Sequence, residues 1–504
     1  MNMKGLTLVK GGVKRFLPFY LLTFLPLTAG AQQVLSLDSC RAMALRNNKQ
    51  MGISQLKQDV AANLRKSART KYLPHVSAIG TYQYTSEEFA LLSDEQKSNL
   101  SNLGTNAVAD VSGKLAQLGL PMEALAQQFP QLTQGVNSAA QLLNNGGQKV
   151  VDALRTDTRN IFAGTIMVTQ PLYLGGSITA LNKLADLNEL MVQNSGDAQR
   201  QTILYTTDQT YWQVVSLKHK QRLAQSYLDL IKKFDGDVQK MIEEGVATKS
   251  DGLSVSVKVN EAEMTLQKVN DGLELSKMLL CQMVGLPMDQ PITLADEDSE
   301  DLGQTATASL NGPMSTRVAS AIDNRPELKM LENSIDMSKQ ATNLLKAGNM
   351  PLVALTGGYV VSNPNVLNGF QKKFGGFWNV GVLVRVPLWN WGDVAYKVRA
   401  SKGVTAIANL ELQEAREKIE LQVNQNSLKV DEANKRLMLA RTGIEKAEEN
   451  LRTANLGFKE GVITPTVVME AQTAWLQSQS QLIDAQIAVK LSQVDLQKSL
   501  GTLY

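Results

Sequence analysis

Few side chains in this 504-residue sequence could do chemistry. The candidates are two histidines, His75 and His219, and two cysteines, Cys40 and Cys281. The histidines are too few and too far apart for a metal site, which needs three or four ligands. The motifs G-x-x-x-x-G-K, H-E-x-x-H and G-x-S-x-G do not occur, so a nucleotide-binding loop, a zinc peptidase or an α/β-hydrolase is not indicated. We therefore predict a protein with no cofactor, no metal site and no catalytic activity.

The two cysteines leave two interpretations open. A disulfide between them is possible in an exported protein, whereas two buried thiols need no pairing. We favour the buried thiols, because neither cysteine is repeated in the other half of what proves to be a duplicated chain.

The N-terminus has the features of a secretory signal peptide. Residues 1–31 contain four basic residues, then the apolar run Phe16–Leu27, then Ala29-Gly30-Ala31, which predicts cleavage before Gln32. A membrane-anchoring helix is the weaker alternative, because the apolar run is too short to span a bilayer easily. Removing the four positive charges changes the formal net charge from +3 to −1 (3 − 4). A near-neutral chain has no basic surface for nucleic acid.

The sequence contains an internal duplication. Identical residue types recur, without a gap, at a spacing of 216 (387 − 171), and closer to the start of each half at a spacing of 277 (351 − 74). The pairs at the first spacing include Pro171 and Pro387, Gly176 and Gly392, Gly245 and Gly461, and Gly285 and Gly501. We predict a first structural repeat at 32–285 and a second at 315–504. The acidic stretch 286–314 between them is expected to be a solvated linker.

Each half contains one very long helix. The stretches 177–244 and 393–460 contain no proline and have 68 residues each (244 − 177 + 1). A helix of that length is roughly 100 Å long at 1.5 Å per residue. Shorter return helices are expected at 249–284 and 465–500, and Ser177 and Asp393 are plausible N-caps of the long ones. Two apolar stripes with small residues on the last helix favour neighbours on both of its sides, as in the wall of a hollow cylinder.

Four segments alternate between apolar and polar residues, which predicts β-strands at 75–84, 160–170, 352–361 and 377–386. Beyond residue 31 no apolar run reaches the roughly 18 residues of a membrane-spanning helix, so a membrane segment would have to be a closed β-barrel. Segments of about ten residues fit membrane strands that face lipid on one side and water on the other. Residues 85–159 form an insertion with helical pieces at 112–128 and 135–154. We expect it at the end of the strands away from the long helices, facing the outside of the cell.

Aromatic side chains mark the places where the chain leaves the strands. The exits are Pro171 to Gly176 and Pro387 to Gly392. Near them lie four aromatic residues, Tyr173, Trp378, Trp389 and Trp391. We favour an interfacial aromatic girdle for these residues, and packing in a core is the alternative.

Each long helix ends in a short glycine turn, Gly245-Val246-Ala247-Thr248 or Gly461-Val462-Ile463-Thr464. Glycine ends one helix and threonine caps the next, with Pro465 at a favoured first position. The chain therefore reverses at these two tips. Asp251 adds a negative charge where it complements the dipole of the new helix.

The whole chain after residue 31 resembles the outer-membrane efflux protein family, the TolC-like channels. The resemblance is carried by Ser36-Leu37-Asp38, Asn324-Arg325-Pro326-Glu327-Leu328, the two Pro-Leu-aromatic exits, both tip glycines and Leu500-Gly501-Thr502-Leu503. It implies an α+β membrane protein that is mainly α, with an internal structural duplication. Three subunits would each give four strands to a twelve-stranded outer-membrane β-barrel that continues into a periplasmic α-barrel tunnel.

The resemblance also implies partners. The tips, at Gly245, Val246, Thr248, Gly461, Val462 and Thr464, would dock a periplasmic membrane-fusion adaptor tied to an inner-membrane pump of RND or ABC type. Relatives close their periplasmic entrance with acidic side chains. Asp251 matches an acid common at the first tip, and the places of the entrance acids on the helix after the second tip are held by Val467 and Glu470, so Val467 replaces one acid. A ring of three Glu470 carboxylates would attract cations, while a solvated surface acid is the alternative.

We therefore predict a homotrimeric exit duct for tripartite efflux or type I secretion in a Gram-negative cell. It would lie in the outer membrane, with most of its mass in the periplasm. The alternative is a periplasmic coiled-coil scaffold or adaptor without a membrane barrel. Such a protein would have no need of four amphipathic strands. An exported enzyme is disfavoured by the absence of a convergent titratable cluster.

Overall fold

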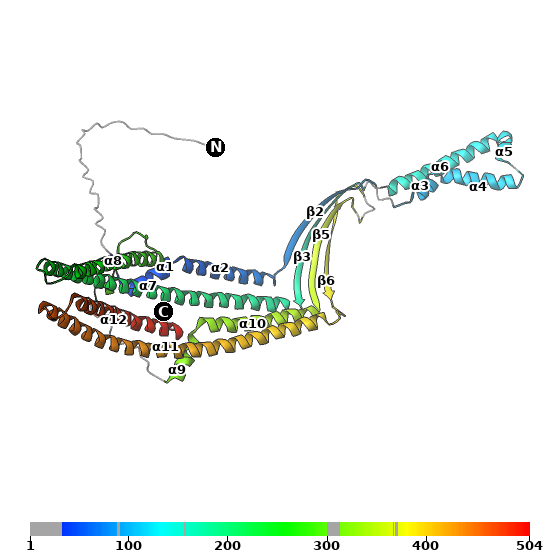
Figure 1. The fold of residues 1–504 in the computed structure, drawn as a ribbon. Coiled ribbons are helices and arrows are strands. Elements are labelled where there is room, and N and C mark those ends of the chain that lie inside the picture. The colour runs from blue at the N-terminus through cyan, green and yellow to red at the C-terminus, as the bar shows by residue number, and fades with distance from the viewer. Residues whose placement is uncertain are drawn as a thin grey trace, which may run out of the picture. The chain divides into compact units, whose positions relative to one another are not determined.

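The computed structural model describes residues 33–87, 91–119, 121–155, 158–299, 313–365, 367 and 371–503. The signal peptide predicted at 1–31 lies outside these residues, as do Glu300 and Asp301 of the acidic stretch. The fold is mainly helical, with a four-stranded sheet and a smaller two-stranded one (Figure 1). Among the described residues, every helix is too short or too polar to cross a bilayer.

Helices of very different length make up most of the fold. In the first half they are α1 (Leu37–Asn47), α2 (Lys49–Thr70), α3 (Asp94–Ser101), α4 (Leu103–Gln117), α5 (Met122–Gln128), α6 (Pro130–Leu154), α7 (Ser177–Glu243) and α8 (Lys249–Val284). In the second half they are α9 (Met314–Asn324), α10 (Pro326–Lys346), α11 (Asp393–Lys459) and α12 (Pro465–Ser499), with short 3-10 turns η1 (Ala295–Asp298) and η2 (Ala347–Asn349).

The two halves build the same pair of long helices. Helices α7 and α11 have 67 residues each, and the return helices α8 and α12 have 36 and 35. The prediction that Ser177 and Asp393 cap the long helices was wrong by one residue. The carbonyl oxygens of Gly176 and Gly392 accept the first helical hydrogen bonds, each at 3.0 Å, so the glycines occupy the N-cap positions.

The four-stranded sheet is antiparallel and has the order β2-β3-β5-β6. Its strands are β2 (His75–Tyr84), β3 (Asn160–Leu174), β5 (Leu352–Asn363) and β6 (Gly375–Arg385). One row across the sheet joins Val76, Val168, Gly357 and Val380 in register, so apolar residues of all four strands share a face. Val76 and Val380 are 68% and 67% exposed, so none of the described residues covers the two ends of this row.

The two-stranded sheet joins the acidic stretch to the start of the described chain. Strand β1 (Gln33–Leu35) pairs in parallel with β4 (Ile292–Leu294). The prediction of a solvated linker is wrong for the residues directly after β4. The Glu297 side chain is 3% exposed and lies 3.2 Å from the Lys277 ammonium. The Asp296 carboxylate likewise accepts a hydrogen bond from the Tyr211 hydroxyl at 2.5 Å. The partners come from α7 and α8, so the acidic composition alone did not reveal them.

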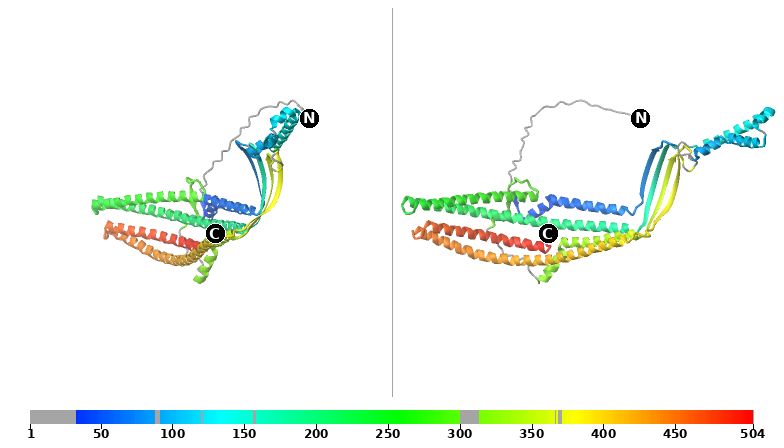
Figure 2. Two further views of the ribbon diagram at one scale, coloured as in Figure 1. Left: turned by 90° about the vertical axis from the view of Figure 1, so that its right-hand side faces the viewer. Right: turned by 45° about the vertical axis from the view of Figure 1, so that its right-hand side comes forward.

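The chain divides into two compact units, each with its own core. Among the described residues, the first lies within 33–48, 203–299 and 428–495, and the second lies within 49–202, 313–427 and 496–503. In the first unit, α8 runs beside the last part of α7, and α12 beside the last part of α11 (Figure 2). In the second unit, α9 and α10 pack on α11 through a cluster that includes Leu328, Ile335 and Val423.

The insertion is more helical than its sequence pattern indicated. We predicted pieces at 112–128 and 135–154, whereas the structure has four helices, α3 to α6, from residue 94 to residue 154. The first predicted piece is interrupted after Gln117, where Gly119 adopts a left-handed φ of 81°. A glycine there ends α4 and lets α5 begin in a new direction.

Candidate functional site

The candidate site lies in the first unit, at the two tips where α7 turns into α8 and α11 turns into α12. At the first tip, Gly245 has a φ of 76°. The Val246 amide donates to the Met241 carbonyl at 2.8 Å, and the Gly245 amide donates to the Ile242 carbonyl at 3.0 Å. This is the bond pattern of a Schellman-type helix end, which needs a left-handed residue at the glycine position.

Helix α8 begins with a reciprocal capping box. The Thr248 hydroxyl accepts a hydrogen bond from the Asp251 amide at 3.2 Å, and the Asp251 carboxylate accepts from the Thr248 amide at 3.0 Å. The same carboxylate accepts from the Thr248 hydroxyl at 2.6 Å. These bonds favour the charged form, so the pKa of Asp251 is lowered. Asp251 therefore holds the first tip in shape.

The second tip has the same turn with a different cap. Gly461 has a φ of 73°, and the Val462 amide donates to the Gly457 carbonyl at 2.9 Å. Helix α12 follows with Pro465 as its first residue and the Thr464 carbonyl as its first acceptor. At both tip glycines an added Cβ would meet nothing within 4 Å, and the neighbouring Val246 and Val462 are exposed. The tips thus present bare backbone and one apolar side chain each.

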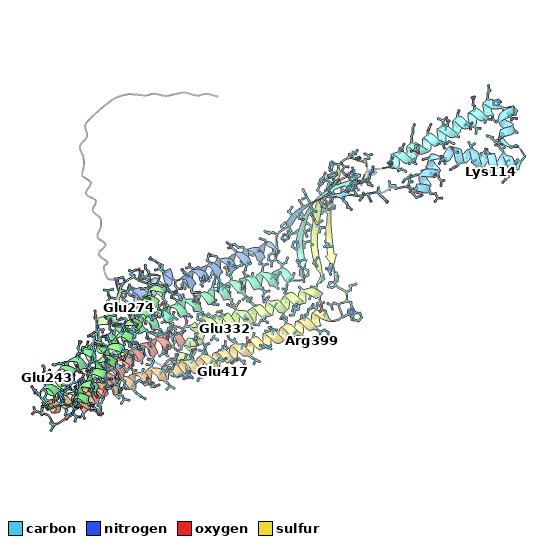
Figure 3. The ribbon with its side chains drawn as sticks, turned by 45° about the horizontal axis from the view of Figure 1, so that its top comes forward. Lys114, Glu243, Glu274, Glu332, Arg399 and Glu417 are labelled. Atoms are coloured by element: carbon cyan, nitrogen blue, oxygen red, sulfur yellow. The ribbon has the colours of Figure 1, made fainter. Side chains whose placement is uncertain are left out.

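A groove of about 680 Å³ connects the two tips. Its walls come from the ends of α7 and α11, and both Val246 and Gly461 border it. The residues that line it include charges of both signs, namely Lys233, Asp237, Lys240, Glu244, Lys459 and Glu460. The Phe234 and Phe458 rings lie 5.0 Å apart and belong to the apolar cluster that holds the four helix ends together. Figure 3 labels Glu243 at this end of α7.

One polar side chain beside the groove has no partner. Gln472 of α12 is 1% exposed and borders the groove, and neither its side-chain oxygen nor its side-chain nitrogen has a hydrogen bond. Leaving a buried donor or acceptor unpaired costs about 1–3 kcal/mol per group. The sequence analysis missed Gln472, because nothing in the local pattern shows which glutamine of α12 will be buried.

The other candidate residues near the two tips, Asp251, Val467 and Glu470, do not line the groove. Val467 is 44% exposed, and Glu470 is exposed on the first turns of α12. Asp251 is already engaged with Thr248 on α8. Of the two acids proposed for an entrance, Asp251 is exposed but bonded to Thr248, whereas Glu470 is exposed and no cap bond engages it.

The strand exits carry exposed aromatic rings. Trp389 and Trp391 are 76% and 85% exposed and pack edge to face, with ring centroids 5.8 Å apart. Trp378 and Tyr173 are also exposed, and the β3–β5 register shifts between Pro171 and Tyr173. These rings therefore do not pack in a core of this chain, which was the alternative to a girdle. Pro387 follows the end of β6.

A buried ion pair was also missed by the sequence analysis. The Asp208 side chain of α7 is 0% exposed and receives two hydrogen bonds from the Arg41 guanidinium of α1, at 2.7 Å and 2.6 Å. Burial raises the pKa of Asp208, and Arg41 opposes that rise. Burial likewise raises the pKa of the Cys40 thiol to about 12, so this cysteine is an unreactive thiol. Within the described residues, no group of three or more His, Cys, Asp or Glu side chains could hold a metal ion.

Comparisons with known proteins agree on one family. A family model described as "Outer membrane efflux protein" matches residues 120–286 and 318–502. The chain is 20% identical over 352 residues to outer membrane protein TolC of Vibrio cholerae, covering 68% of this chain and 77% of that protein. Among solved structures it resembles VceC of V. cholerae (TM-score 0.67, 14% identity, 92% and 96% of the two chains). It also resembles the CmeC channel of Campylobacter jejuni (TM-score 0.68, 12% identity, 93% and 86%).

Proposed function

Because this chain belongs to the outer membrane efflux protein family, we propose that it is a homotrimeric exit duct for tripartite efflux or type I secretion. In this proposal an inner-membrane pump, of RND or ABC type, supplies the energy. A periplasmic membrane-fusion adaptor joins that pump to the tips. The chain itself would be a passive conduit in the outer membrane, with most of its mass in the periplasm.

The observation that carries the proposal is a sheet that is unfinished within one chain. Strands β2 and β6 are the two edges of the four-stranded sheet, so each has unpaired backbone groups on one side. Four strands are too few to close on themselves, whereas three copies supply twelve strands (3 × 4). The exposed apolar row from Val76 to Val380 would then face lipid, and the exposed tryptophans would lie at the membrane boundary.

The tips suit a docking surface for another helical protein. They combine two exposed valines, bare glycine backbone and a groove whose lining includes charges of both signs. An apolar centre with a polar rim is the usual composition of a protein interface. The unpaired Gln472 borders the groove, and because its amide is buried, a bound peptide backbone would pair with it only where binding moves the groove lining apart.

The entrance of the duct is proposed to be lined by Glu470, one from each of three subunits. Carboxylates held close together repel one another and attract cations, so such a ring would form a narrow, cation-selective entrance. Asp251 supports the tip through its capping box, and Val467 adds an apolar surface beside the ring. A scaffold or adaptor without a barrel is not favoured, because it gives the four-stranded sheet no role.

The proposal is tested by the state of the protein extracted from membranes. We expect a trimer that requires detergent, that migrates differently on gels before and after heating, and that forms channels in planar bilayers. Light scattering in detergent gives the mass of the protein part. A monomer that stays in solution without detergent and gives no conductance would contradict the proposed function.

A further inference from the structure

The insertion between β2 and β3 is a helical hairpin in which one face of α6 packs against α3 and α4. Helices α3 and α4 lie along α6 so closely that a Cβ on Gly147 would come within 1.8 Å of the Leu100 carbonyl oxygen (Figure 1). A Cβ on Gly104 would come within 2.1 Å of the Ala140 carbonyl oxygen. The Asn144 side chain fixes the register, because its oxygen accepts from the Gly104 amide at 2.7 Å.

A second apolar stripe follows α6 on a different side, and none of the described residues covers it. We call it the outer stripe, and it consists of Leu132, Gly135, Ala139, Leu142, Gly146 and Val150. Its residues recur every three or four positions, as in the contact seam of a helix bundle. Leu142 is 72% exposed and Leu132 is 60% exposed.

The glycines of the outer stripe distinguish it from an ordinary solvated face. A glycine within a helix costs about 1 kcal/mol relative to alanine. Gly104 and Gly147 are explained by the close contacts above, but an added Cβ at Gly135 or Gly146 would meet nothing within 4 Å. Bare glycine backbone, which allows close helix packing, is therefore also present on a face of α6 against which none of the described residues packs.

The charge pattern points to an identical partner. Between Leu118 and Gln148 the sequence has one charged residue, Glu123. Two copies of an uncharged surface can approach without like-charge repulsion, and an apolar seam does not need a complementary surface of opposite charge. A solvent-facing loop normally carries mixed charges, so this composition favours burial between copies.

The position of the insertion would place the insertions of neighbouring subunits close to one another. Its two ends join Tyr84 and Asn160, which pair directly in the sheet, so the hairpin stands at the end of β2 and β3. This step relies on the proposed function, in which twelve strands form a barrel roughly 25 Å across. Three hairpins rooted on a ring of that size are within reach of one another, because each helix is about 10 Å wide.

We propose that the outer stripes of the three α6 helices pack against one another and form a homotypic helical crown at the outer end of the channel. The partner of this surface is thus a second copy of the same insertion. The crown would hold the three hairpins as one unit over the exit.

Single cysteines in the full-length protein test the crown. In a Cys40→Ser, Cys281→Ser background, Ala139→Cys places a thiol on the outer stripe, while Asn145→Cys places one about 120° around the same helix. Copper-phenanthroline oxidation of the protein in detergent should give covalent dimers from Ala139→Cys, at least about ten-fold more than from Asn145→Cys. One chain in each trimer stays unlinked, because one thiol pairs with one other.

A further variant and the particle mass separate the possible outcomes. Adding Gly146→Leu should lower the dimer yield of Ala139→Cys without lowering expression, because the site is open within the chain. A trimer by mass with equal or no cross-linking at the two positions would overturn the crown and leave the proposed function standing. A monomer by mass would overturn both. Quenching of a label at Ala139→Cys by lipid-borne probes in liposomes, without cross-links, would assign the stripe to lipid and overturn the crown.

Discussion

Replacing Gln472 with leucine should stabilise the tip region, which is unusual for a change at a fully buried position. The side chain has two buried groups without hydrogen bonds, and each costs about 1–3 kcal/mol. Leucine has a similar volume and would meet the apolar cluster around Phe234 and Phe458, so no cavity is created. We expect a net gain of about 2 kcal/mol in the free energy of local opening.

Hydrogen exchange of the α12 amides measures this effect. A gain of about 2 kcal/mol slows exchange by roughly 30-fold when opening is limited by equilibrium, since 1.4 kcal/mol corresponds to ten-fold. The matched control is Gln486→Leu, at another buried glutamine of α12, a residue that does have a polar interaction. That variant should exchange at the same rate as the parent or faster. Faster exchange in Gln472→Leu would show that its amide is satisfied, for example by water, and would refute the reasoning.

Three further predictions concern the tips and the entrance. Gly245→Leu should abolish export but leave trimers in the membrane. A side chain at a left-handed φ costs about 1–2 kcal/mol, and leucine would cover the bare backbone of the tip. Gly236→Ala, in the open interior of α7, should export normally, and export assays and gel mobility check both variants. Glu470→Gln should weaken block of single-channel current by divalent cations, and unchanged block would remove Glu470 from the entrance. The folded pKa of Asp251 is lowered, so its contribution to tip stability is present above the unfolded pKa and is lost as the pH falls through the folded one; Asp251→Asn should remove this acid dependence in hydrogen exchange of the first turn of α8.

Properties that repeat along the chain were predictable from the sequence. The long helices follow from two proline-free stretches bounded by glycines, and the structure begins α7 and α11 at Ser177 and Asp393 as expected. The strands follow from alternation, and β2 spans His75–Tyr84. The turn at Thr248 follows from a capping pattern of four residues. All of these depend on interactions within a few positions or on strict periodicity.

Features that join distant segments were not predictable. The Lys277–Glu297 and Arg41–Asp208 pairs each join two separate elements, so composition suggested a solvated acidic linker and gave no sign of a buried aspartate. The groove at the tips needs the ends of α7 and α11 to be neighbours, although they are far apart in sequence. Periodicity shows that a helix has a buried face, but the identity of the residue opposite depends on the tertiary packing.

The tips combine well-satisfied helix ends with one unsatisfied amide, and this contrast argues for a surface that changes partners. Thr248 and Asp251 are joined by reciprocal hydrogen bonds, so the start of α8 is capped without any ligand. Gln472, on the helix after the second tip, breaks the rule that buried polar groups are paired. Leucine at position 472 would give a more stable tip, so glutamine at this position is not explained by stability. Departures from local rules inside otherwise consistent structure are expected where binding matters more than stability. The same reasoning applies to Gly146 in the insertion, where an added Cβ would meet none of the described residues within 4 Å.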